Sequence, residues 1–335
     1  MKAISCERPG SLVHREVRKP DTGKGDILVK IERIGVCGTD LHAFAGNQAF
    51  FTYPRILGHE IAATVCKSHD SGLQAGDPVV VIPYIHCGLC KACKSGKTNC
   101  CSNLKVLGVH TDGAMQEYMA LPEQLLLRGH GLSWEELAIV EPLSVAAHAV
   151  SRGGINEGDE VLIMGCGPIG LALMVFADLA GAQVTALDTN PVRLELAKNH
   201  FHAQSTIDAN KLAADPEYKT QYTSRFDLVF DATGNKQAME SGPYYADHGG
   251  KYILVGLYKE SLSFHHPSLH ARELSLLCSR NATRSDFLQV MEILRLKKFP
   301  TKWYHSHDLT FDQVPDRFGQ LTDPSNNVIK AMIRL

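Results

Sequence analysis

The sequence lacks three features that would place the protein in a membrane, on a nucleic acid or outside the cell. It contains no run of about 18 apolar residues, so no segment is long enough to span a bilayer as a helix. Its 34 Lys and Arg residues are balanced by 36 Asp and Glu residues, which does not favour a nucleic-acid partner. The first residues, MKAISCERPG, carry charges where a signal peptide has an apolar core. We therefore expect a cytoplasmic protein without a membrane or nucleic-acid partner, whose thiols stay reduced.

Cysteine, by contrast, is plentiful, and five of the ten lie in one lysine-rich segment, CGLCKACKSGKTNCC. A reducing compartment disfavours a disulfide cluster, and CGLC does not stand at a strand-to-helix turn as a thioredoxin-like redox pair would. Cys87, Cys90, Cys93 and Cys101 follow the spacing C-x2-C-x2-C-x7-C, which suits a tetrahedral zinc ion. Cys100 is an alternative fourth ligand, because spacing barely separates it from its neighbour. Such a site is closed to substrate, so we expect its metal to stabilise a loop.

A second set of candidate metal ligands is spread over three short motifs. These are GVCGTDLH with Cys37, Thr39, Asp40 and His42, LGHE with His59 and Glu60, and VEPLSVAAHAV with Glu141. A thiolate, an imidazole and carboxylates are reasonable zinc ligands, and three protein ligands leave a position for water or a substrate oxygen. Each motif alone is a weak signal, but their order beside the cysteine loop favours a catalytic metal site.

The hydrophobic pattern divides the chain into two kinds of structure. Up to about residue 145 it predicts short strands, such as DILVKIERIG at residues 26–35. From about residue 159 buried strands alternate with helices, beginning with EVLIMG, PIGLALMVFADLAGA and QVTALD. This alternation predicts an α/β fold with a doubly wound parallel sheet. A helix at residues 284–298 and a strand at residues 327–335 are expected to follow.

One turn of the second region has a nucleotide-binding fingerprint. VLIMGCGPIG contains Gly165, Gly167 and Gly170 in the pattern G-x-G-x-x-G, between a predicted strand and a helix. The glycines permit a tight turn, close approach of a pyrophosphate and close helix–strand packing, and the helix N-terminus favours the anion. Asp188 ends the next strand, where a carboxylate accepts ribose hydroxyls and repels a 2′-phosphate, which favours NAD over NADP. Arg193 follows, placed either to bind a phosphate or to stack near the adenine.

Taken together, the motifs resemble those of the zinc-dependent medium-chain alcohol dehydrogenases over essentially the whole chain. The matching segments, in family order, are GVCGTDLH, LGHE, CGLCKACKSGKTNCC, GVHTDGAMQEY, VEPLSVAAHA, GCGPIG and FDATGN. The resemblance implies a GroES-like catalytic domain at residues 1–146, a Rossmann NAD-binding domain at residues 147–281, and a return to the catalytic domain at residues 282–335. It also implies a homodimer or homotetramer.

The resemblance assigns roles residue by residue. It implies a catalytic zinc ion bound by Cys37, His59 and Glu141, with Glu60 close enough to bind directly, and a proton relay through Thr39 and His42. It implies a second, structural zinc ion on Cys87, Cys90, Cys93 and Cys101. The residues that it places along NAD are Gly165, Gly167, Pro168, Ile169, Gly170, Asp188, Thr189, Arg193, Thr233, Val255, Gly256, Leu257, Ser279, Arg280 and Asn281.

Glu141, in the place of a second cysteine, indicates the polyol and sugar-acid branch of that family. The expected reaction transfers a hydride from a secondary alcohol of a sugar acid, such as L-galactonate or L-gulonate, to NAD. A neutral polyol such as sorbitol is the alternative substrate. A sugar acid needs a cation for its carboxylate, and the candidates are Arg280, Arg55 and His110. Two further alternatives are a zinc-free reductase of activated double bonds, which the three ligands disfavour, and a non-catalytic NAD(H) and zinc sensor, which the relay disfavours.

Overall fold

The computed structural model of the protein describes residues 1–23, 25–48, 51–68 and 72–335. Its internal contacts divide the chain into two compact units, residues 1–142 with 283–335 and residues 143–282. The domain divisions expected from the sequence follow residues 146 and 281, whereas the two units divide after residues 142 and 282. The first unit therefore takes both ends of the chain, and the second takes the middle.

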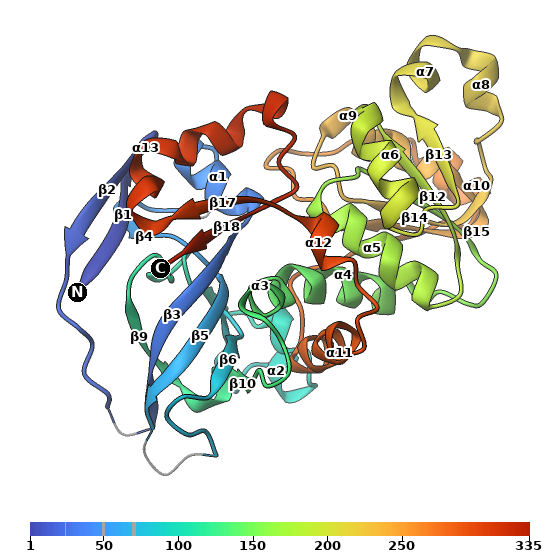
Figure 1. Cartoon of the computed structure of the whole chain (residues 1–335). Helices are drawn as coiled ribbons and strands as arrows, with labels where there is room; N and C mark the ends of the chain where they lie inside the picture. Colours follow the sequence, from blue (N-terminus) through green and yellow to red (C-terminus); the bar gives the residue numbers. More distant parts are fainter. Residues whose placement is uncertain (24, 49–50, 69–71) are drawn as a thin grey trace. The chain divides into compact units, whose positions relative to one another are not determined.

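The first unit is built around a mostly antiparallel sheet with β3 at its centre (Figure 1). Its strands are β3 (Asp26–Val36), β5 (Glu60–Lys67), β6 (Pro78–Val81), β9 (Tyr118–Pro122), β10 (Leu126–Arg128), β17 (His305–Thr310) and β18 (Lys330–Arg334). β5 lies along one side of β3, while β9 and β18 pair with the first and last parts of its other side. The strand predicted at residues 26–35 is confirmed, and the last strand is shorter than predicted.

Smaller elements complete the first unit. Two minor sheets consist of β1 (Lys2–Arg8), β2 (Ser11–Glu16) and β4 (Arg55–Ile56), and of β7 (Tyr84–Ile85) and β8 (Lys105–Val106). The helices are α1 (Gly38–Ala45), α2 (Lys91–Lys94), α3 (Trp134–Ala138), α11 (Arg284–Arg295), α12 (Thr301–Tyr304) and α13 (Val314–Arg317). The helix predicted at residues 284–298 is confirmed as α11. Its Thr283 and Asp286 form a capping box that sets its start.

The second unit is organised on one parallel sheet in the order β13-β12-β11-β14-β15-β16. Its strands are β11 (Glu160–Met164), β12 (Gln183–Asp188), β13 (Ser205–Asp208), β14 (Phe226–Asp231), β15 (Ala246–Leu254) and β16 (Ser275–Cys278). When these six strands are numbered 1 to 6 along the chain, their order across the sheet is 3-2-1-4-5-6, the strand order of a Rossmann fold. The predicted α/β fold, a doubly wound parallel sheet joined to a β-rich unit, is confirmed.

Helices separate most of these parallel strands, as right-handed crossovers require. They are α4 (Val140–Gly153), which crosses the boundary between the units, α5 (Pro168–Leu179), α6 (Pro191–His200), α7 (Ala209–Ala214), α8 (Pro216–Thr220), α9 (Lys236–Ser241) and α10 (His266–Ala271). α5 contacts β11 and β12, and α6 contacts β12 and β13 (Figure 1). Residues 170–177 of α5 are all buried, which explains why this part of the helix has an apolar sequence.

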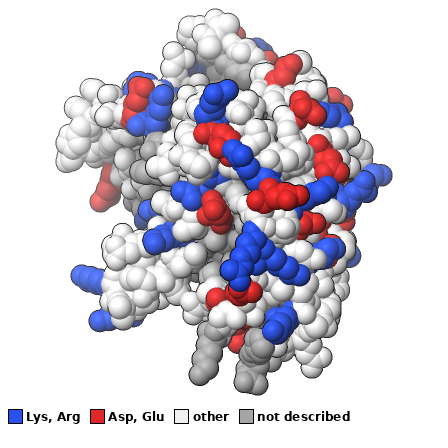
Figure 2. Space-filling model, turned by 90° about the vertical axis from the view of Figure 1, so that its left-hand side faces the viewer, with Lys and Arg blue, Asp and Glu red and all other residues white. Residues whose placement is uncertain are grey.

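Two further observations concern the helices and the surface charges. Among the described residues, no helix combines the length and the apolarity that a membrane crossing needs. On the face of the molecule in Figure 2, Lys and Arg side chains alternate with Asp and Glu side chains. That face therefore shows no extended patch of one charge of the kind that nucleic-acid binding uses.

The glycines of the fingerprint give a test of the packing in the second unit. A Cβ at Gly170 would lie 1.7 Å from the carbonyl oxygen of Gly165, whereas one at Gly167 would meet no atom within 4 Å. We expect Gly170→Ala to lower the free energy of unfolding by ~1–3 kcal/mol, because the backbone must move to remove the overlap. Gly167→Ala is the matched control and should change it by less than ~0.5 kcal/mol. Denaturant unfolding measures both, and equal stabilities would contradict this account of α5 packing.

Candidate metal centre and cofactor site

Three donor groups from two paired strands meet in the first unit. One ligand atom each of Cys37, His59 and Glu60 lies within 4.8 Å of the others. Cys37 stands between β3 and α1, and Glu60 begins β5. The antiparallel register sets Gly35 opposite Glu60, so the end of one strand faces the start of the other. We call Cys37, His59 and Glu60 the Cys37 group.

Asp40 connects the two loops that supply this group. It is fully buried in the first turn of α1, where Oδ2 accepts a hydrogen bond from the Cys37 N–H (2.9 Å) and Oδ1 accepts one from the Gly58 N–H (3.1 Å). Oδ1 also lies 3.7 Å from Nδ1 of His59. A carboxylate behind an imidazole is the usual arrangement around a metal-binding histidine. Asp40 therefore holds the backbone on both sides of the site and lies behind the imidazole of His59.

Glu60 is held by a cation that the sequence reasoning missed. Lys330 on β18 donates from Nζ to Oε1 (2.6 Å) and Oε2 (2.8 Å) of Glu60 and to the Val36 carbonyl (3.1 Å). Burial alone would lower the pKa of Lys330, but the charges of Glu60 and Cys37 outweigh it and raise the pKa. Gly35 makes room for the pair, since a Cβ there would lie 1.9 Å from Glu60 Oε2. A single Lys within the buried strand KAMIR was the available signal.

Glu141, the remaining expected ligand, lies outside the Cys37 group. It is in the first turn of α4, 6% exposed, and its Oε1 accepts a hydrogen bond from the Tyr84 hydroxyl. Burial raises the pKa of Glu141, and the nearby His59 opposes this shift. Burial and the charge of Glu141 together raise the pKa of Tyr84 well above its ordinary value, so the phenol stays a donor. Tyr304 is also fully buried, and burial together with the charges of Glu60 and Glu141 raises the pKa of its phenol.

The donor set fits a divalent zinc ion. Nδ1 of His59 is buried without a hydrogen-bond partner among the described residues, so the imidazole is not committed to a purely structural network. With Cys37 ionised, the anions Cys37, Asp40, Glu60 and Glu141 outnumber the buried cation Lys330 by three charges. A divalent ion offsets most of that excess, and unpaired buried charge is otherwise costly. Thiolate, imidazole and carboxylate are also the ligand types that zinc accepts.

The loop after β7 gathers the second set of donors. The Sγ atoms of Cys87, Cys90, Cys93 and Cys101 lie within 4.8 Å of one another, while Cys100 is exposed and outside the set. Backbone N–H groups point at the sulfurs: Cys90 N to Cys87 Sγ is 3.4 Å, and Cys93 N to Cys90 Sγ is 3.5 Å. N–H groups of Cys93 and Ser102 lower the pKa of Cys90 to about 5. The sequence spacing left Cys100 and Cys101 as alternatives for the fourth donor, and in the structure Cys101 is the one that joins the other three.

The proton-relay candidates lie beside the Cys37 group on one helix. Thr39 and His42 are three residues apart in α1, so they share a face. Thr39 is partly buried and His42 is exposed. This gradient from the interior to solvent is what a proton exit needs.

In the second unit, the cofactor candidates stand along one edge of the sheet. Met164, Leu187, Asp231, Leu254 and Cys278 occupy one row of register across five strands. The predicted residues come directly after this row, at Gly165–Gly170, Asp188–Thr189, Thr233, Val255–Leu257 and Ser279–Asn281, with Arg193 in α6. Carboxyl ends of parallel strands are where such sheets bind nucleotides.

Asp188 is fixed by the turn that it faces. Its Oδ2 accepts a hydrogen bond from the Cys166 N–H (2.6 Å), and its Oδ1 accepts one from the Asn190 N–H (2.8 Å). A carboxylate has about four acceptor positions, so each oxygen keeps capacity for a ribose hydroxyl. Gly165 has φ +93°, which the tight turn before α5 requires. Thr233 is tied by N and Oγ1 to Asp231, whose pKa burial raises to about 6.

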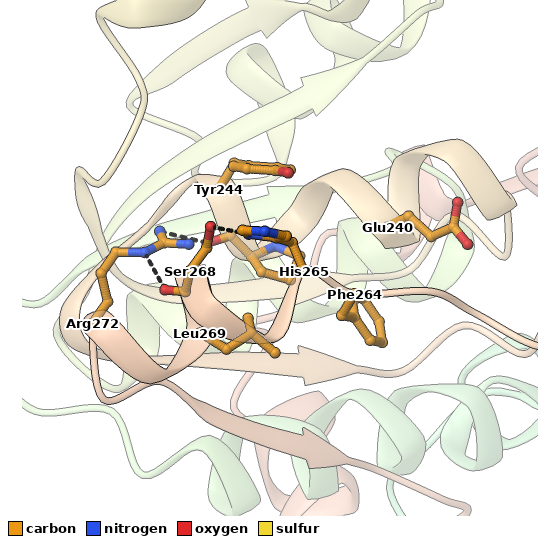
Figure 3. Close-up of a pocket in the computed structure, with 8 residues that line it drawn as sticks. Glu240, Tyr244, Phe264, His265, Ser268, Leu269 and Arg272 are labelled. Carbon is orange, nitrogen blue, oxygen red and sulfur yellow. Dashed lines mark hydrogen bonds between the residues drawn. The ribbon is translucent and has the colours of Figure 1, made fainter.

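A separate hollow in the second unit does not suggest a ligand site. It is lined by Glu240, Pro243, Tyr244, Phe264, His265, Ser268, Leu269 and Arg272 (Figure 3). The guanidinium of Arg272 donates to the carbonyls of Ser268 (3.1 Å), Pro243 (2.8 Å) and Ala246 (2.9 Å). The side chain therefore fastens α10 to the preceding turn, and its donors are used within the protein.

Comparison with known proteins places both units in established families. Residues 23–130 match the alcohol dehydrogenase GroES-like domain, and residues 168–295 match the zinc-binding dehydrogenase family. The chain is 37% identical to L-galactonate-5-dehydrogenase of Escherichia coli K12, covering 99% of this chain and 98% of that protein. It is 31% identical to sorbitol dehydrogenase of Bacillus subtilis, covering 99% and 97%. The structure matches an Escherichia coli CFT073 enzyme described as a short chain alcohol dehydrogenase, RspB, complexed with NADH (TM-score 0.92, 27% identity, covering 100% and 99%).

The buried ion pair gives a test of the candidate metal centre. We expect Lys330→Met in the metal-stripped protein to cost ~3–5 kcal/mol of unfolding free energy, because Glu60 keeps its charge without a partner. Lys297→Met is the matched control: its ion pair with Glu136 has nearly the same length (2.7 Å), but the lysine side chain is 67% exposed. Its loss should cost less than ~1 kcal/mol. Equal costs in urea unfolding would show that the buried pair has no special role.

Proposed function

The chain belongs to the zinc-dependent medium-chain alcohol dehydrogenase family, and from that premise we propose that it oxidises a secondary alcohol of a sugar acid with NAD as hydride acceptor. The observation that supports this most directly is the Cys37 group, in which a partly buried thiol, a buried imidazole and a buried carboxylate lie together next to Glu141. The high identity to a sugar-acid dehydrogenase over nearly the whole chain supports the substrate class.

We propose that Cys37, His59 and Glu141 hold a catalytic zinc ion, with Glu60 as the nearby carboxylate, and that Cys87, Cys90, Cys93 and Cys101 hold a structural one. A zinc ion at the first site supplies Lewis acidity, which lowers the pKa of an alcohol. Asp40 holds the backbone N–H of Cys37 and lies 3.7 Å from Nδ1 of His59. Thr39 and the exposed His42 would pass the alcohol's proton toward solvent.

NAD is the proposed cofactor because of Asp188. Its carboxylate is fixed at the end of β12 with lone pairs available for two ribose hydroxyls, and its negative charge repels a 2′-phosphate. The free N–H groups at the start of α5 are placed to receive the pyrophosphate. A homodimer or homotetramer is the proposed assembly, by analogy with the family.

A neutral polyol is the second candidate substrate, because two cations of the first unit, Lys330 and Arg55, are already engaged. Lys330 is bound to both oxygens of Glu60. Arg55 is paired with Asp112 (3.2 Å) and bonded to Thr52, so it meets a substrate carboxylate only by giving up these contacts. The identity to a sorbitol dehydrogenase supports the same alternative.

Substrate class is tested by initial rates of nicotinamide reduction. The panel contains L-galactonate, L-gulonate, their epimeric aldonates, sorbitol and galactitol, each with NAD and with NADP. We expect the highest kcat/KM for one aldonate with NAD, and no turnover for Cys37→Ser, which loses a metal ligand. A preference for a polyol would replace the sugar-acid proposal, a preference for NADP would contradict the role of Asp188, and full activity of Cys37→Ser would contradict the metal mechanism.

The structural metal is tested by zinc content and stability. We expect about two zinc ions per wild-type chain, and about one in Cys90→Ser, with a lower Tm because the loop loses its closed site. Cys100→Ser is the matched control, since that exposed thiol lies outside the donor set and should affect neither quantity. Zinc loss in Cys100→Ser instead would make Cys100 the fourth ligand.

A further inference from the structure

We infer that Tyr84 is a positioning residue that makes Glu141, rather than Glu60, the carboxylate ligand of the catalytic metal. Its phenol holds one oxygen of Glu141 and leaves the other for the ion. The inference rests on the proposed function, because it requires a metal at the Cys37 group. It concerns a residue that no motif singled out and that lies far from Glu141 in the sequence.

The two carboxylates beside the Cys37 group are bound in different ways. Glu60 is the nearer to Cys37 and His59, but both of its oxygens accept hydrogen bonds from Lys330, at 2.6 and 2.8 Å. Among the described residues, Glu141 accepts a side-chain hydrogen bond through Oε1 alone, and its donor is the Tyr84 hydroxyl. Binding a metal through Glu60 would therefore place a second cation beside the buried ammonium of Lys330, whereas Glu141 is bonded to a neutral phenol. The charge of the hydrogen-bond partner thus outweighs the shorter distance in selecting the ligand.

Tyr84 is itself held rigidly, as a positioning group must be. It begins β7, pairs with Val106 of β8, and is 5% exposed. Its ring packs edge-on against the fully buried Phe287 of α11, with centroids 6.1 Å apart and planes at 84°. The phenol therefore stays aimed at Glu141, and the carboxylate takes its orientation from it.

One consequence concerns the open coordination position. With Oε1 of Glu141 engaged by the Tyr84 phenol, we expect Oε2 to be the oxygen that binds the metal. Together with Cys37 and His59 this makes three protein donor atoms and leaves a position for substrate. Without the hydrogen bond from the Tyr84 hydroxyl, the Glu141 carboxylate can rotate away from the metal or bind it through both oxygens. Loss of such outer hydrogen bonds typically costs 10–100-fold in metal affinity.

The test is a double-mutant cycle of metal affinity on the full-length protein. Zinc release is followed against increasing chelator for the wild type, Tyr84→Phe, Glu141→Ala and the double variant. Wild type should release zinc in two steps, with the four-cysteine site as an internal reference. Tyr84→Phe keeps the ring and its contact with Phe287, so it should fold, and it should weaken the first step by about tenfold or more. In the Glu141→Ala background the same change should have almost no effect, because the phenol acts through that carboxylate.

Tyr252→Phe is the matched control for removing a buried phenol. Its hydroxyl donates to the Met239 carbonyl (2.8 Å) in the second unit, and its loss should leave both release steps unchanged. A wild-type chain that releases zinc in one step would overturn the proposed function and this inference with it. If the wild type releases zinc in two steps, two results would overturn the inference alone. One is that Tyr84→Phe leaves the chelator concentration of the first step unchanged. The other is that Tyr84→Phe shifts the first step equally with and without Glu141→Ala.

Discussion

The register of β3 is the constraint on which the candidate metal centre depends. This strand pairs with β5 on one side and with β18 on the other, and it ends one residue before Cys37. The pairing sets Gly35 opposite Glu60 and brings Lys330 within reach of both Glu60 oxygens. A slip of one residue would turn each of these side chains to the other face of the sheet. Backbone hydrogen bonds of an ordinary sheet thus bring together groups from three distant parts of the chain.

The second unit uses strand ends in a simpler way. Five parallel strands finish in one row of register, and the segments that follow them supply all the cofactor candidates but Arg193. The turn before α5 is held from both sides: Gly170 lets the helix approach, and Asp188 accepts the Cys166 N–H. The same carboxylate that shapes the turn is the proposed ribose partner. A change at Asp188 would therefore affect the turn and the cofactor together.

Features encoded over short spacings could be predicted from the sequence. The fold class, the glycine fingerprint and the clustering of Cys87 with its neighbours depend on residues a few positions apart. Spacing could not separate Cys100 from Cys101, because that choice depends on which side of the loop each thiol faces. Lys330 and Tyr84 were missed because each acts across a long sequence separation as a single residue without a motif. What they contact depends on strand register, which one sequence does not specify.

The position of β18 in the sheet has a consequence for how the protein is made. β18 lies between β3 and β17, and 140 residues of the chain fold as the other unit before it is synthesised. On the ribosome, the last part of β3, residues 33–36, therefore lacks its β18 partner until then, and Glu60 lacks its cation. Long-range pairing of this kind is slow and leaves a strand edge exposed meanwhile. During synthesis the middle unit is free to reach its native state first, and the metal centre is completed only when residue 330 joins residues that emerged long before it.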